Sequence, residues 1–132
     1  MTTHINGTFD IKLTPQAHED GVGDASVARM SFDKQFFGDL DAVSKGQMFA
    51  VRTDTAGSAG YVAMERVVGT LQGRKGSFAL QHSGTMAHGE KQLSVTVVPD
   101  SGTEELSGIS GKMGIEIVEG KHLYTFEYAF AS

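Results

Sequence analysis

Three polar side chains suited to acid–base chemistry or ligand binding fall on two adjacent segments in the middle of the sequence: Glu65, Arg74 and His82. Burial disfavours the charged form of a carboxylate and raises its pKa, which suits a general acid or base. An imidazole can pass a proton or hold a polar ligand atom near neutral pH. A guanidinium can clamp a ligand carboxylate. These residue types allow proton transfer or ligand recognition, but they name no substrate.

Each of the three residues also has a structural interpretation, which stays open on the sequence alone. Glu65 could form an ion pair with Arg74, with Arg66 or with another cation inside the fold, since buried ion pairs often serve architecture. His82 could be a hydrogen-bonded histidine of the wall or rim. Arg74 could fix its turn or face solvent.

A predicted hairpin positions these side chains. Residues 61–71 and 74–86 are typical of strands, and a two-residue turn at Gln72-Gly73 would place Glu65 opposite Leu80 and Ala63 opposite His82. That register gathers one face of the hairpin from Tyr61, Glu65, Val67, Phe78, Leu80 and His82. The other face is also partly apolar, with Val62, Met64, Val68 and Ala79. Hydrophobicity alone therefore does not say which face points inward.

The rest of the chain repeats the period-two alternation that predicts strands. The chain holds 17 glycines, 2 prolines and no tryptophan, a composition that suits tight turns. Strands are expected at 4–13, ending before Pro15, at 25–36, at 39–42 and 47–54 with a kink between them, at 91–98, at 105–110, at 112–119 and at 121–130. We expect a single all-β domain over residues 1–132, a closed antiparallel barrel of about eight strands with little helix.

Composition argues against several classes of function. The net charge of −5 and the scattered basic residues disfavour nucleic-acid binding. No cysteine is present, so disulfides and thiol catalysis are excluded, which indicates a reducing compartment or indifference to redox. Residues 1–7 lack a basic segment followed by an apolar one, and a cytoplasmic location is expected. No run approaches the ~18 apolar residues of a membrane helix, so no membrane partner is expected. The five histidines, at positions 4, 18, 82, 88 and 122, lack the spacing of a metal site, and neither a metal nor another cofactor is expected.

Three segments carry a resemblance to a known family. They are residues 61–66, residues 69–82 with the motif Gly-Arg-x-Gly-Ser-Phe, and residues 98–108 with the motif Ser-Gly-Thr-x-x-Leu. Through them the chain resembles a family of small bacterial proteins of unassigned function that shares the barrel fold of plant allene oxide cyclase. The resemblance covers the chain from about Gly7 to Phe130. It implies an eight-stranded barrel with a cavity and assembly of copies through the outer wall, but it does not imply the cyclase activity.

We consider three functions, in this order. The first is a barrel that binds a small, largely apolar molecule, with Tyr61, Glu65, Arg74, Phe78 and His82 as the candidate ligand-binding residues. The second is a cofactor-free isomerase or cyclase in which Glu65 or His82 transfers a proton. The third is a structural protein whose solid barrel builds a homo-oligomer.

Overall fold

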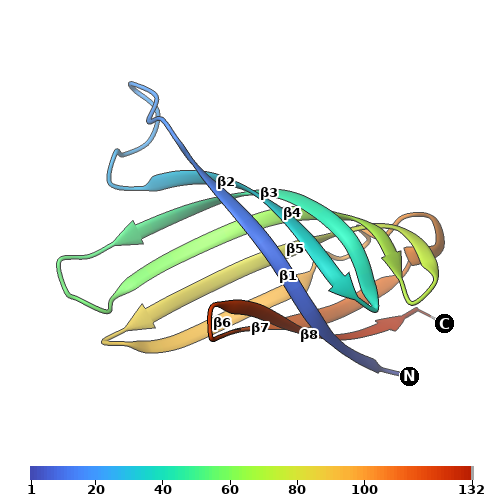
Figure 1. Ribbon diagram of the computed structural model, residues 1–132. Coiled ribbons are helices and arrows are strands. Elements are labelled where there is room, and N and C mark those ends of the chain that lie inside the picture. Colours follow the sequence, from blue (N-terminus) through green and yellow to red (C-terminus); the bar gives the residue numbers. More distant parts are fainter. Residues whose placement is uncertain (132) are drawn as a thin grey trace.

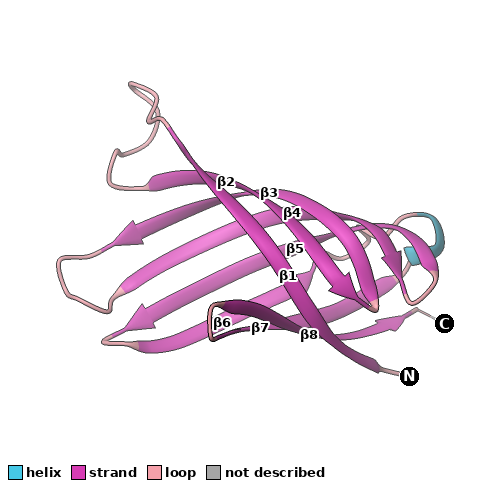
Figure 2. Cartoon of the chain, in the orientation of Figure 1, coloured by secondary structure: helices cyan, strands magenta, loops and turns pink. Residues whose placement is uncertain are grey.

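The computed structural model describes residues 1–131 and shows a closed antiparallel barrel, as the alternation of the sequence predicts. Within residues 1–131, eight strands follow each other around the barrel in chain order, and the only helix is one short 3₁₀ turn (Figures 1 and 2). The elements are β1 (Thr3–Gln16), β2 (Ala28–Gly38), β3 (Leu40–Arg52), β4 (Ala59–Leu71), β5 (Arg74–Ala87), β6 (Glu90–Val97), η1 (Glu104–Leu106), β7 (Ile109–Val118) and β8 (Lys121–Phe130).

The hairpin of β4 and β5 has the predicted turn and register. Gln72 and Gly73 both adopt positive φ angles, 46° and 84°, as a two-residue hairpin turn that matches the strand twist requires. Glu65 lies opposite Leu80, and Ala63 lies opposite His82. The face that carries Glu65 and His82 points into the barrel, because both side chains are buried while Met64 on the other face is exposed. The structure thus decides which face is internal.

One half of the barrel is filled by apolar side chains. This closed end lies where the two termini and the β2–β3, β4–β5 and β6–β7 connections gather, to the right in Figure 1. The 3₁₀ turn η1 places Leu106 in the core. Phe78 stacks on Phe126 with ring centroids 5.6 Å apart, and Phe36 meets the ring of Tyr124 edge-on. Closely packed rings of this kind fill the interior of the closed end.

The opposite end of the barrel is open. It carries the β1–β2 loop, which projects at the upper left of Figure 1, and the turns of the β3–β4, β5–β6 and β7–β8 hairpins. Leu13, Leu93 and Ile117 share the strand parity of the inward-facing core, yet they are 47%, 43% and 64% exposed. Inward-facing apolar side chains are therefore left uncovered at this end alone.

The kink expected between residues 42 and 47 is wrong, because β3 runs without interruption from Leu40 to Arg52. The glycine that suggested the break, Gly46, has a packing role. A Cβ atom at this position would lie 2.4 Å from the ring of Phe32 and 2.8 Å from the Cβ atom of Glu65. Gly46 keeps the inner wall of β3 free for these two neighbouring side chains.

Other expected boundaries also differ. β1 does not stop before Pro15, because Pro15 pairs with Met30 as β1 extends along β2 to Gln16. Residues 105–110 do not form a strand of their own, since η1 occupies Glu104–Leu106 and β7 begins at Ile109. β2 begins at Ala28 rather than at residue 25. The end of a strand depends on how far its neighbour extends and pairs with it, and the propensities of single residues do not reveal this.

The outer wall of β3 and β4 carries exposed apolar side chains: Val43, Phe49, Val51, Val62, Met64 and Val68. The expected homo-oligomer stays a prediction, and this face is where a second copy could pack. Within residues 1–131 the structure contains no helix of the length and hydropathy needed to cross a membrane.

The packing role of Gly46 leads to a test of stability. We expect Gly46→Ala to lower the free energy of unfolding by about 1–3 kcal/mol, because the new methyl group would collide with Phe32 and Glu65. Gly60→Ala is the matched control, since the nearest atom to a Cβ there is 3.8 Å away. Urea unfolding of both variants measures the difference. Equal stabilities of the two variants would contradict the packing role.

Candidate functional site

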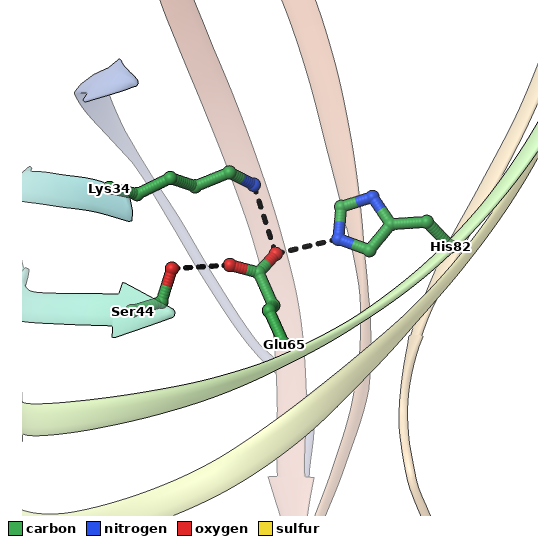
Figure 3. Close-up of polar contacts among 4 residues, drawn as sticks. All are labelled: Lys34, Ser44, Glu65 and His82. Atoms are coloured by element: carbon green, nitrogen blue, oxygen red, sulfur yellow. Dashed lines mark hydrogen bonds and ion pairs between the residues drawn. The ribbon is translucent and has the colours of Figure 1, made fainter. Parts of the chain in front are cut away.

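Four polar side chains form a connected group inside the barrel: Lys34, Ser44, Glu65 and His82. Glu65 is the centre, as Figure 3 shows, with Lys34 and Ser44 on one side and His82 on the other. Its Oε1 atom accepts hydrogen bonds from Lys34 Nζ at 2.9 Å and from His82 Nε2 at 2.6 Å. Its Oε2 atom accepts one from Ser44 Oγ at 2.5 Å. All four residues are buried.

Four consecutive strands supply this polar quartet. Lys34 lies on β2, Ser44 on β3, Glu65 on β4 and His82 on β5, each at an inward-facing position of its strand. Lys34 and Ser44 face each other in the register. The register partner of Glu65 is Gly46, whose missing side chain leaves the space beside the Glu65 Cβ atom. The carboxylate can therefore reach across β3 to Ser44 and Lys34.

The ammonium group of Lys34 is surrounded by aromatic rings. Its Nζ atom lies 4.8 Å from the ring centroid of Phe9, 5.2 Å from that of Phe32 and 5.6 Å from that of Phe36. The negative faces of such rings attract a cation, and this attraction is stronger where water is excluded. The rings and the Glu65 carboxylate together replace the water that Lys34 loses on folding.

Glu65 is held as a carboxylate. Burial is the largest influence on its pKa and raises it, but the hydrogen bond from His82, the charge of Lys34 and the hydrogen bond from Ser44 together outweigh burial. The pKa of Glu65 is therefore lowered from its ordinary value. The raised pKa expected from the sequence is wrong, because the sequence did not reveal Lys34 as the partner. Among the alternatives considered, the ion pair with another cation of the barrel is the arrangement found.

Two aromatic rings flank His82 on the inner wall. The ring of Tyr61 lies 6.3 Å from the His82 ring and that of Phe32 lies 6.5 Å away, centroid to centroid. Tyr61 is half-buried, and its pKa is raised by burial and by the charge of Glu65. Its phenol is therefore neutral at physiological pH. The structure thus brings three of the five candidate ligand-binding residues together: Tyr61, Glu65 and His82.

The other two candidates lie elsewhere. Arg74 is exposed at the closed end, where its guanidinium carbon lies 4.2 Å from the ring centroid of Phe130. Phe78 is fully buried in the closed-end core. Sequence reasoning missed Lys34 and Ser44. The signal for Lys34 was its position between Phe32 and Phe36 at the same strand parity, which makes a lysine inward-facing on an apolar strand face.

A groove of about 980 Å³ opens at the open end, between the β1–β2 loop and the inner faces of β1, β2 and β3. Its wall is mostly apolar and includes Leu13, Met30, Met48 and Ala50. Within residues 1–131, no group of three or more histidine, aspartate or glutamate side chains lies close enough to hold a metal ion. The expectation of a protein without metal or cofactor stays a prediction.

The ion pair can be tested by a double-mutant cycle. We expect Glu65→Gln and Lys34→Met each to lower the free energy of unfolding by about 3–5 kcal/mol, because each leaves the remaining buried group without its partner. The double variant should lose less than the sum of the two single losses. Urea unfolding measures all four proteins. Additive losses would show that the two residues do not interact. Ser44→Ala, which removes only one hydrogen bond, provides a milder perturbation of the same carboxylate.

The pH dependence of stability provides a second test. Because the pKa of Glu65 is lower in the folded chain than its ordinary value of 4.5, Glu65 contributes stability that is present above pH 4.5. That contribution is lost as the pH falls through the folded pKa. We expect the free energy of unfolding to fall less steeply below pH 4.5 in Glu65→Gln than in the unmodified protein. Unfolding curves recorded across this range measure both slopes, and parallel slopes would contradict the lowered pKa.

Comparison with known proteins agrees with the barrel. The family model described as "Protein of unknown function (DUF3224)" matches residues 5–128. The chain is similar to a crystal structure of a protein of unknown function from the DUF3224 family of Shewanella oneidensis MR-1, at 46% identity over 100% of both chains with a TM-score of 0.92. Comparison with the curated proteins finds no match. The resemblance to a family of unassigned function is confirmed, and the chain belongs to the DUF3224 family of proteins.

Proposed function

We propose that the protein binds a small, largely apolar molecule at the open end of the barrel. One observation carries the proposal: apolar side chains with inward-facing parity are buried at the closed end but remain uncovered at the open end, where one of them, Leu13, lines a groove of about 980 Å³. Small-molecule sites are concave, mostly apolar and of this size range, with a few polar groups that orient the ligand. Exposed apolar surface in such a groove favours an apolar occupant.

The register connects the groove to the polar quartet. Met30, Met48, Ala63 and His82 are successive register partners across β2, β3, β4 and β5, and the first two line the groove. In the neighbouring row Ala50, which also lines the groove, pairs with Tyr61. A ligand that lies along these rows would reach the ring of Tyr61 and then the edge of His82. Tyr61 and His82 do not line the groove itself, and the proposal is that a bound molecule extends from the groove along these rows to reach them.

An isomerase or cyclase without a cofactor is the second candidate, and the 2.6 Å contact between Glu65 and His82 favours it. In such an enzyme His82 would move the proton, because Glu65 is held as a carboxylate by its neighbours. The proposal also includes a cytoplasmic location, with which a chain free of cysteine is compatible.

Ligand binding at the groove can be tested with a matched pair of methionines. We expect Met48→Lys to weaken the binding of an apolar fluorescent dye by about tenfold or more, because a charge in the apolar wall opposes burial of the dye. Met64→Lys introduces the same side chain on the outer wall of the adjacent strand and should leave dye binding unchanged. Fluorescence titration measures the dissociation constants.

Native mass spectrometry of the protein as purified provides an independent readout of a retained apolar molecule. Equal effects of Met48→Lys and Met64→Lys would show that the dye binds elsewhere. No saturable binding to the unmodified protein would contradict the proposed function.

A further inference from the structure

We infer that the ligand carries a neutral hydrogen-bond donor, such as a hydroxyl group, and that this group donates to Nδ1 of His82. The inference rests on the proposed function and narrows its ligand class to apolar alcohols or phenols. Its basis is a buried imidazole that is held by Glu65 through one ring nitrogen and whose second ring nitrogen makes no hydrogen bond within residues 1–131.

The quartet determines which nitrogen of His82 carries the proton. Nε2 lies 2.6 Å from Oε1 of Glu65, and an ionised carboxylate only accepts hydrogen bonds, so Nε2 is the donor. The charge of Glu65 is already balanced by Lys34 at 2.9 Å. A doubly protonated His82 would add a second positive charge to this buried group without a second carboxylate. The neutral ring with Nε2–H is therefore the form that the site favours, and Nδ1 then presents a lone pair.

Nδ1 of His82 is unpaired and reachable. It makes no hydrogen bond within residues 1–131, and no fully buried side-chain nitrogen or oxygen there lacks a partner, so a small part of the Nδ1 surface is accessible although the side chain is only 4% exposed. The surroundings of His82 are less closely covered on the side of the open end. On the closed-end side the neighbouring inward residues Glu65 and Leu80 are buried, whereas Tyr61 and Leu93 on the other side are partly exposed.

The lone pair of Nδ1 selects among ligand groups. A hydroxyl or N–H group would donate to it, while a carboxylate would bring its own lone pairs against it and gain no hydrogen bond. Lys34 cannot compensate for a ligand carboxylate, because its ammonium lies among three aromatic rings and already pairs with Glu65. The half-buried ring of Tyr61 supplies an apolar surface beside the His82 ring.

The first test needs no ligand. Long-range ¹H–¹⁵N NMR correlations of the unliganded protein report which nitrogen of each histidine ring is protonated. We expect His82 to be neutral and protonated at Nε2 at neutral pH. A His82 ring protonated at Nδ1, or at both nitrogens, would overturn the inference even if every ligand probe binds.

The second test compares naphthalene, 1-naphthol and 1-naphthoate, which share one apolar body and differ in the polar group. We expect the protein to bind 1-naphthol about tenfold more tightly than naphthalene, with 1-naphthoate weakest. In His82→Phe the preference for naphthol should disappear while naphthalene still binds. Met64→Lys, on the outer wall, should retain the preference.

The outcomes separate the two claims. Binding of all three probes with equal constants overturns the donor inference and leaves the proposed function standing. Binding of none overturns both. A His82→Phe variant that keeps the naphthol preference also overturns the inference. If that variant does not fold, the NMR result and the ranking of the three probes on the unmodified protein decide it.

Discussion

The arrangement inside this barrel depends on one buried ion pair, between Lys34 on β2 and Glu65 on β4. Two opposite charges lie among apolar side chains, so each requires the other and neither can be lost alone without leaving an unpaired buried charge. The pair joins two strands that are not register neighbours, across the intervening β3. Gly46 and Ser44 on β3 make this possible, one by leaving space and the other by donating a hydrogen bond.

The same pair sets the chemistry of its neighbours. Because Lys34 balances Glu65, the carboxylate stays ionised and acts as an acceptor for His82 and Ser44. A carboxylate that orients an imidazole is a positioning group, which leaves the imidazole as the side chain able to meet a ligand. The group combines structural and functional roles: Glu65 and Lys34 support the barrel, and His82 lies at the border between the packed and open halves.

The two ends of the barrel differ in how their inward-facing side chains are used. Toward the termini, aromatic and aliphatic side chains fill the interior, as in other small barrels whose interior has room only for side chains. Toward the β1–β2 loop, the inward-facing side chains remain uncovered beside the groove. A core that filled both halves would leave no place for a ligand, and an interior open along its whole length would lose much of its apolar packing. The polar quartet lies between these two regions.

Much of the fold follows from local sequence pattern. The period-two alternation and the two-residue turn at Gln72-Gly73 predict the strands and the register that places Glu65 and His82 on one face, because register in a hairpin is a local property. The continuity of β3 through Gly46 could not be predicted, because a glycine in a sequence is compatible both with a kink and with a straight strand packed beneath a neighbouring ring.

What the sequence determined by itself is therefore the barrel class and the register of the hairpin formed by residues 61–71 and 74–86. The tertiary structure alone decided that this face is internal, that Lys34 is the partner of Glu65 and that Arg74 lies at the opposite end from the groove. The physical reason is barrel closure. It brings strands into contact whose residues are far apart in sequence, and the pKa of a buried group depends on those contacts.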